Sequence, residues 1–215
     1  MQLRVSQSVQ TLLIRNLAAF AIASGAIVAH ADETNWRVLL GASVASGGDS
    51  IVNGTITTIG TTHVIPFNIK AGGDIQLRLG ADYRFSDRFT LQASIAHAST
   101  DPMGIDGSLT FRTVPLEVLG FFDLTDSIRL GLGPRKSFAH MGGTGKAEGW
   151  PGLGTYTGSN GAVLELQYLW NTSNSAAGSR KSQFAINFRR VAESFSHEGV
   201  EFSGNHFEIG VAAYF

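Results

Sequence analysis

Apolar and polar residues alternate with a period of two along most of this chain. In residues 74–85, DIQLRLGADYRF, the apolar and aromatic residues hold the odd-numbered positions from 75, and polar residues or glycine hold the even ones. This alternation predicts a β-strand whose two faces meet different environments. Residues 86–88 suit a turn, and residues 89–97 repeat the pattern, so the two runs predict a β-hairpin.

The same period recurs in six further segments, which are residues 36–46, 108–122, 128–140, 162–170, 182–191 and 207–215. We therefore predict an all-β fold of eight strands. Three connections are short or moderate, at 86–88, 123–127 and about 171–181. The other four are generally longer and rich in Gly, Ser, Thr and Asn, near 47–73, 98–107, 141–159 and 196–204. Short turns on one side and long loops on the other are typical of a closed antiparallel up-and-down transmembrane β-barrel with periplasmic turns and extracellular loops.

One predicted strand, residues 108–122, departs from the regular pattern. Pro115 lies inside it, where the missing N–H is normally tolerated only at a sheet edge or a bulge. Leu109 and Phe111 cannot share a face with Leu116 and Val118 unless an extra residue is inserted between them. A bulge in this strand is therefore expected.

The longest loop also contains strand-like sequence. Residues 51–59 and 63–69 could form a further hairpin and raise the strand number to ten. Their faces consist mostly of Thr, Asn and Gly, which are too polar to face lipid. We expect a hairpin within the loop, standing above the membrane, and keep ten strands as the alternative.

The N-terminal 31 residues have the pattern of a secretory signal peptide. Residues 1–16 contain two Arg and no acid, residues 17–28 are continuously apolar, and residues 29–31 read Ala-His-Ala. This order of charged start, apolar middle and small-residue exit predicts cleavage and export, leaving residues 32–215 as one barrel domain. Nothing later in the chain approaches about 20 unbroken apolar residues, which excludes a helical multi-span membrane protein.

Composition narrows the function classes further. The 215 residues are 43% hydrophobic and 15% charged, with 26 Gly and no Cys. The absence of Cys excludes disulfide scaffolds, thiolate catalysis and thiolate metal sites. A net charge of −1 offers no basic surface for nucleic acid.

The position of the aromatic residues separates a membrane barrel from a soluble, lipocalin-like barrel, whose apolar face would line the inside. Seven of the eight predicted strands place an aromatic residue at the short-turn end, namely Trp36, Tyr83/Phe85, Phe89, Phe121/Phe122, Tyr168/Trp170, Phe184 and Tyr214/Phe215. An interfacial girdle predicts this arrangement. We therefore favour the membrane barrel, with Leu79 and Leu166 facing lipid and Gln76 facing inward.

Charges of both signs fall on the opposite, inward face of the strands. The predicted barrel-interior charges are Arg78, Asp82, Arg84, Arg129, Glu165, Arg189 and Glu208. Since an unpaired charge inside a narrow barrel is costly, these groups are expected to pair across the lumen and largely fill it. The inward Gly80, Gly131, Gly133 and Gly210 are expected to leave unfilled volume.

The chain resembles the small, porin-like outer-membrane β-barrel proteins of Gram-negative bacteria. The resemblance rests on the signal peptide, the segment GADYRFSDRFTLQASIAH and the C-terminal GVAAYF. It implies Sec-dependent export to the outer membrane, a monomer without cofactors, and contact with outer-membrane lipids and lipopolysaccharide. It also implies an assembly signal in the last strand, read by the barrel-assembly machinery, for which Gly210, Ala213 and Phe215 match, Ala213 being smaller than usual.

Three functions remain open at this point. The first is a structural or surface-interaction barrel, and the second is a narrow channel for small or apolar solutes. The third is a lipid A-modifying enzyme, because His97 and Ser99, followed by Asp101, resemble the His-x-Ser pair of lipid A deacylases. Thr100 replaces the Asn of that motif, and the pair lies on the third strand instead of near the C-terminus. We therefore predict no enzyme, and assign no catalytic, cofactor-binding or metal-binding residue.

Overall fold

The computed structural model describes residues 35–57, 64–101, 103–104, 107–171 and 183–215. The predicted signal peptide and nearly all of the 171–181 connection lie outside these ranges. Within them, no helix is long and apolar enough to cross a membrane.

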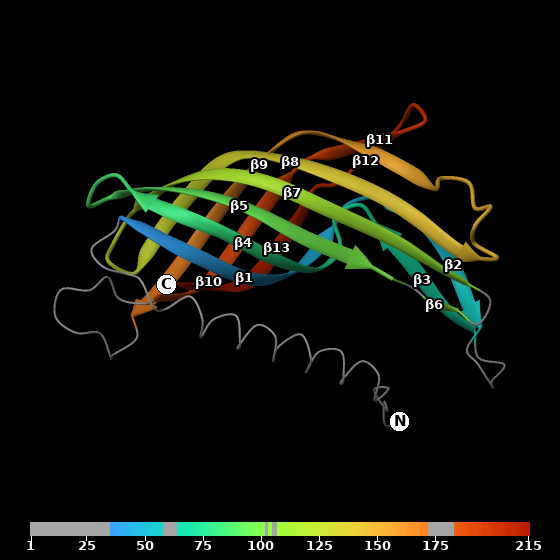
Figure 1. Ribbon diagram of the computed structural model, residues 1–215, viewed down its shortest axis with the longest axis horizontal. Coiled ribbons are helices and arrows are strands. Elements are labelled where there is room, and N and C mark those ends of the chain that lie inside the picture. Colours follow the sequence, from blue (N-terminus) through green and yellow to red (C-terminus); the bar gives the residue numbers. More distant parts are fainter. Residues whose placement is uncertain (1–34, 58–63, 102, 105–106, 172–182) are drawn as a thin grey trace, which may run out of the picture.

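Eight antiparallel strands close into a barrel (Figure 1). They are β1 (Trp36–Gly47), β4 (Asp74–Arg84), β5 (Phe89–Thr100), β7 (Gly107–Asp123), β8 (Ile128–Gly145), β9 (Gly154–Asn171), β10 (Gln183–Ala192) and β13 (His206–Tyr214). Neighbours in this sequence are hydrogen-bonded, and β13 pairs with β1 to complete the ring. The predicted all-β, eight-stranded, up-and-down barrel is confirmed, because each strand alternates between an inner and an outer face.

The two ends of the barrel differ as the connection lengths predict. At one end, called the short-turn end here, residues 85–88 join β4 to β5 and residues 124–127 join β7 to β8. The other end, the loop end, carries five additional strands: β2 (Ser50–Thr57), β3 (Val64–Lys70), β6 (Met103–Gly104), β11 (Ser194–His197) and β12 (Val200–Ser203). Strands β2 and β3 form a two-stranded sheet of their own, as expected for a hairpin within the loop. The ten-strand alternative is therefore wrong.

The bulge expected in β7 is absent, and that prediction is wrong. The register of β7 with β8 is continuous from Gly107↔Gly145 to Asp123↔Arg129, and Pro115 pairs opposite Ser137 within it. Leu109 and Phe111 are buried on the inner face. They lie on the face opposite to that of Leu116. No bulge is needed to bury them, because the inside of the barrel is itself apolar at the loop end.

The change of phase occurs instead in β9. The β8–β9 register shifts between Lys136 and Phe138, where Lys136 pairs with Asn160 and Phe138 with Thr157. Between this bulge and the short-turn end, odd-numbered β9 residues such as Glu165 point inward. Between the bulge and the loop end, the even-numbered Tyr156 points inward. The sequence pattern of β9 stops at this position, which explains why the predicted strand began only at residue 162.

Candidate functional site

Among the residues that the structure describes, the interior of the barrel holds ten buried charged residues. These are five arginines and five carboxylates: Arg37, Arg78, Arg129, Arg135, Arg189, Asp82, Glu117, Glu165, Glu193 and Glu208. Their formal charges cancel. Because each would be costly alone, a balanced set is the arrangement that lets all ten remain ionised away from water.

Arg189 on β10 lies at the centre of this network. Its guanidinium contacts Glu165 at 3.0 Å, Glu208 at 2.5 Å and Glu117. Glu165 also accepts a hydrogen bond from Arg78 across the lumen, at 3.1 Å. Four strands are therefore linked through one guanidinium, which is suited to this role because it presents five donors in a fixed plane.

A second group lies toward the short-turn end, around Asp82. Its carboxylate pairs with Arg37 and with Arg129, the latter at 3.4 Å. The Arg129 guanidinium lies over the rings of Phe121 (4.3 Å) and Tyr214 (4.8 Å). These cation–π contacts place aromatic faces where further carboxylates would otherwise be needed.

A third group lies toward the loop end. Arg135 contacts Glu117 at 2.5 Å and Glu193 at 3.2 Å. Ser137 donates to the same Glu193 carboxylate at 2.5 Å, and His206 Nε2 lies 3.0 Å from Glu208. The three groups together extend the ion-pair network through the middle of the barrel.

The structure places six of the seven predicted interior charges in this network. Arg84 is the exception: its side chain is 40% exposed at the short-turn mouth, where it contacts Asp123 at 3.4 Å. The interior residues that the sequence reasoning missed are Arg37, Glu117, Arg135 and Glu193. Arg135 and Glu193 continue the parity of Arg129 and Arg189, so extending the alternation would have found them, whereas the supposed bulge concealed Glu117.

The inward glycines do not leave unfilled volume, and that expectation is wrong. Phe121 covers Gly131, its direct register partner, so closely that a Cβ on Gly131 would lie 2.4 Å from the Phe121 ring. A Cβ on Gly80 or on Gly210 would collide with the adjacent strand, at Ala93 O and Ala42 O. These glycines allow close approach of neighbouring groups.

Apolar side chains replace the ion pairs inside the loop end. Nine residues form one buried cluster: Val52, Ile69, Ala71, Leu109, Phe111, Ala139, Met141, Tyr156 and Phe195. Val52 and Ile69 belong to the β2–β3 hairpin, while the others include barrel strands and β11. The hairpin is therefore packed onto the barrel end, and the loop end forms a structured head.

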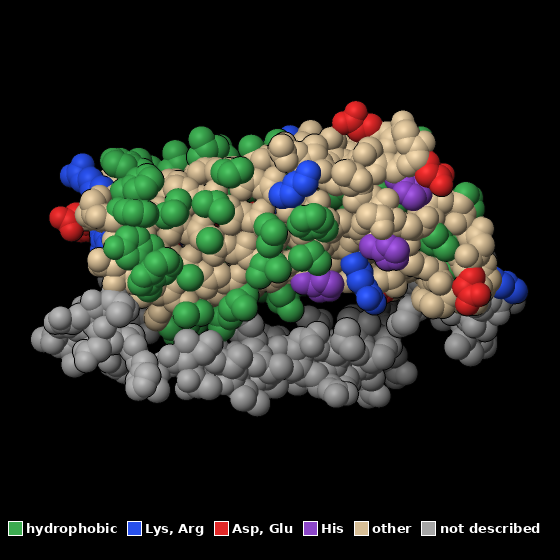
Figure 2. Space-filling view, turned by 45° about the horizontal axis from the view of Figure 1, so that its top comes forward, with side chains coloured by type: hydrophobic (Ala, Val, Ile, Leu, Met, Phe, Trp, Pro, Cys, Tyr) green, Lys and Arg blue, Asp and Glu red, His purple; other side chains and the backbone are tan. Residues whose placement is uncertain are grey.

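The outer surface of the barrel is apolar over the short-turn half. Figure 2 shows hydrophobic side chains gathered there as a belt, with charged and histidine side chains concentrated on either side of it. Leu79 is 52% exposed and Leu166 42%, whereas Gln76 is 3% exposed, as the alternation predicts. The apolar face thus points away from the barrel interior, opposite to the lipocalin-like alternative.

Aromatic side chains occur along the short-turn edge of this belt. Trp36 and Tyr83 are in contact with ring centroids 4.8 Å apart, and Trp170 stacks on Phe184 at 6.0 Å. The assignment of Phe121 and Tyr214 to the girdle is wrong, because both side chains are fully buried inside the barrel. Both are used there as partners of Arg129.

His97, Ser99 and Asp101 are not arranged as a catalytic triad. Ser99 Oγ donates to Asp101 Oδ2 at 2.7 Å, and His97 is exposed on the outer face. A nucleophilic serine needs a base within hydrogen-bond reach, and here the recorded partner of the hydroxyl is a carboxylate. Within the described residues, no group of three or more His, Cys, Asp or Glu side chains could hold a metal ion.

The C-terminal residues complete the barrel wall. Gly210 lies on the inner face of β13 beside Ala42 and Ser43 of β1, and Ala213 pairs opposite Leu40. The backbone of Phe215 forms two hydrogen bonds of 3.0 Å with Val38. The chain therefore remains paired with β1 to its last residue.

Comparisons with known proteins give structural similarities only. No family model and no curated protein matches the chain. Among solved structures it is similar to Ail, the attachment invasion locus protein of Yersinia pestis (13% identity, 84% of this chain and 97% of that chain, TM-score 0.44). It is also similar to neisserial surface protein A (13% identity, 85% and 98%, TM-score 0.46). A third similarity is to OmpT, an outer membrane protein of Vibrio cholerae (13% identity, 84% and 52%, TM-score 0.32).

Proposed function

We propose that this protein is an integral outer-membrane β-barrel with a structural or surface-interaction role, and that it is not an enzyme. The observation that carries the proposal is the inverted distribution of side chains. Ten charged groups are buried inside, while large apolar groups such as Leu79, Leu132 and Ile209 are exposed on the wall. A continuous apolar belt of this kind is stable in hydrocarbon and would aggregate in water.

The head at the loop end supports the surface-interaction role. Its hairpins are held by the buried cluster around Phe111 and Tyr156, so it presents a defined surface beyond the membrane. Ordered polar surface on a rigid scaffold is the usual basis of specific recognition. Outer-membrane lipids, lipopolysaccharide and the assembly machinery are the partners we propose for the wall and the last strand.

The ion-pair network supports a closed lumen over the narrow-channel alternative. An eight-stranded barrel is only just wide enough to be filled by its own side chains, and here opposite charges meet across it. A water-filled path through the barrel would have to separate these pairs.

The membrane location is tested by fractionation of cells that express the full chain. We expect the protein in the outer-membrane fraction, with heat-modifiable migration on gels. Recovery of folded protein in the soluble periplasm without detergent would contradict the proposal.

The closed lumen is tested by single-channel recording in planar bilayers. We expect no stable conductance steps of porin size. Regular steps of that size would favour the channel function instead.

A further inference from the structure

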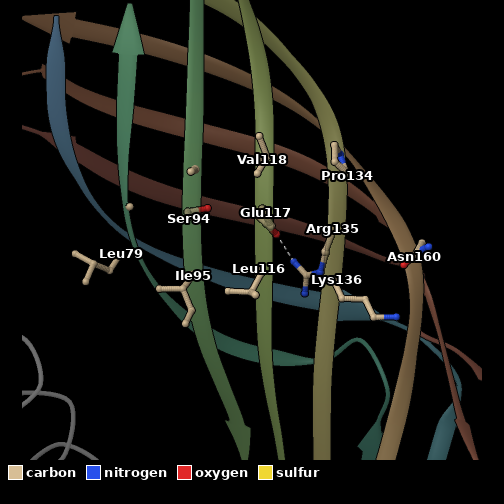
Figure 3. Close-up of a pocket in the computed structure, with 12 residues that line it drawn as sticks. Leu79, Ser94, Ile95, Leu116, Glu117, Val118, Pro134, Arg135, Lys136 and Asn160 are labelled. Atoms are coloured by element: carbon tan, nitrogen blue, oxygen red, sulfur yellow. Dashed lines mark hydrogen bonds and ion pairs between the residues drawn. The ribbon is translucent and has the colours of Figure 1, made fainter.

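The ten interior charges cancel as a set, but they do not cancel at each level of the barrel. The central and loop-end groups hold three of the arginines and all four glutamates of the described network. Figure 3 shows one of their pairs, Glu117 and Arg135, pointing toward each other from β7 and β8. The group around Asp82 holds two arginines, Arg37 and Arg129, and one carboxylate. The formal charge is therefore −1 in the first set and +1 in the second.

A buried histidine offsets the negative set. His206 Nδ1 lies 2.6 Å from Gly204 O, and Nε2 lies 3.0 Å from the Glu208 carboxylate. Both of these oxygens are acceptors, so both ring nitrogens donate and the imidazole ring carries a positive charge. At the short-turn mouth, Asp123 pairs with Arg84 and adds no net charge. The surplus positive charge of the interior therefore remains in the group around Asp82.

Two buried donors in this same group lack a hydrogen-bond acceptor among the residues that the structure describes. They are Nη2 of Arg129 and Nε2 of Gln92, and the two residues are 1% and 0% exposed. An unpaired buried donor is costly, and more so on a charged group. Because buried polar groups in folded proteins are normally paired, these two atoms indicate a partner that is not a protein group.

Contacts join Arg129 and Gln92 on two sides. On one side, Gln167 Oε1 accepts a hydrogen bond from Arg129 Nε at 2.7 Å. The Tyr214 hydroxyl lies 3.1 Å from this oxygen and 3.1 Å from Gln92 Oε1. On the other side, Gln92 is the register partner of Asp82, which Arg129 Nη1 contacts at 3.4 Å. The two unpaired donors therefore belong to one ring of side chains inside the short-turn half.

The chemistry of this ring selects a small anion. Asp82 is already engaged, since its Oδ1 accepts from Arg37 Nε at 2.9 Å and its Oδ2 faces both arginines. A partner for the two donors must accept hydrogen bonds, and a single negative charge cancels the surplus. It must also be small, because Leu39 and Phe121 fill the interior at this level. These requirements favour a halide over sulfate or phosphate.

We propose that Arg129 Nη2 and Gln92 Nε2 bind a chloride-sized monovalent anion inside the barrel. The guanidinium provides a charge-assisted hydrogen bond, and the amide provides a second donor. The anion makes the interior neutral, which removes the cost of an uncompensated buried charge. Because both donors are shielded from solvent, the ion is taken up as the barrel folds and stays as part of the folded structure.

The site is tested by urea titration of the barrel folded in lipid vesicles, with chloride exchanged for gluconate at constant ionic strength. Gluconate carries the same charge but is too large to enter the interior. The variants are Gln92→Glu, which introduces a carboxylate at the site, and Gln92→Leu, which removes the amide donor. The matched control is Gln76→Leu, which removes a buried amide that lies 3.4 Å from Glu208, outside the proposed site.

For the wild type, the folding equilibrium constant should rise about tenfold for each tenfold rise in chloride above its dissociation constant, as expected for one bound ion. Gln92→Glu should be equally stable in chloride and in gluconate, because its carboxylate supplies the missing charge. In Gln92→Leu the rise should begin at a chloride concentration about tenfold higher, because one hydrogen bond to the ion is lost. Gln76→Leu should keep the chloride dependence of the wild type, whatever its own stability.

Equal stability of the wild type in chloride and in gluconate would overturn the proposal, and would mean that water pairs with the two donors. An unchanged chloride dependence in both Gln92 variants would also overturn it, since the ion would then bind elsewhere. Crystals grown in bromide provide a second readout: an anomalous peak beside Arg129 and Gln92 supports the site, and its absence there contradicts it. Either failure contradicts this site alone, because a barrel that folds into vesicles without chloride keeps the proposed outer-membrane function.

Discussion

The two halves of this barrel have opposite side-chain distributions, although the same strands run through both. In the short-turn half, ion pairs such as Arg189–Glu165 occupy much of the interior, and leucines such as Leu79 face outward. In the loop half, Phe111 and Met141 form an apolar interior, and polar residues such as Thr155 face outward.

The difference shows that the surroundings of each half, and not the strand itself, determine which face is apolar. The short-turn half has the pattern expected in lipid, and the loop half has that of a water-soluble domain. The change occurs within single strands: on β7 the inward positions pass from Glu117 to Phe111 without a break in register.

The largest loss of stability is expected when the central guanidinium, that of Arg189, is removed. Arg189→Met leaves Glu117, Glu165 and Glu208 short of a positive partner, and we expect a loss of about 3–5 kcal/mol in the free energy of unfolding. Urea titration of the barrel folded in lipid vesicles measures it. Arg84→Met, at the exposed mouth, should cost less than about 1 kcal/mol. Equal losses for both variants would show that the interior network adds no more stability than the exposed Arg84–Asp123 pair.

Placing a charge on each half of the outer wall compares the two environments directly. Leu79→Arg or Leu166→Arg should cost about 2–4 kcal/mol because the guanidinium would face hydrocarbon near mid-bilayer. Thr155→Arg, on the outer face of the loop half, should cost about 0–1 kcal/mol. The same reversible folding assay ranks the three variants by their loss in the free energy of unfolding. The reverse ranking would show that the loop half, and not the short-turn half, lies in the membrane.

A smaller effect is expected when the packing of the head is loosened. Ile69 is fully buried between the β2–β3 hairpin and the barrel end. Ile69→Val should cost about 0.5–1.5 kcal/mol, because one methylene group is removed from a packed site. Hydrogen exchange should rise in residues 48–71 while that of the short-turn half is unchanged. Faster exchange throughout the barrel would mean that the two halves unfold as one unit.

The smallest effect on the folded barrel is expected at the last residue. Phe215→Ser keeps the backbone, and so the two hydrogen bonds to Val38, and the urea midpoint should change little. If Phe215 is part of the assembly signal, the rate of insertion into the outer membrane should fall much more than the stability of the folded barrel does. Pulse-chase measurement of heat-modifiable protein follows the rate. Unchanged surface levels would show that Phe215 only packs against the wall.

The sequence by itself determined the eight barrel strands and the direction of most of their side chains. Strict alternation in residues 74–85 is enough to place Leu79 outside and Arg78 inside, because a strand directs successive side chains to opposite faces. Alternation also predicted seven interior charges, of which six lie inside and Arg84 does not, and its extension would have added Arg135.

Only the tertiary structure decided which residues meet across the lumen and where the interior becomes apolar. Arg189 and Glu117 lie 72 positions apart in the chain, and closure of the barrel brings them together. The bulge in β9 and the burial of Leu109 both depend on contacts with neighbouring strands and with the β2–β3 hairpin. A local pattern records only that one face is apolar, and it cannot tell whether lipid or a packed hairpin covers that face.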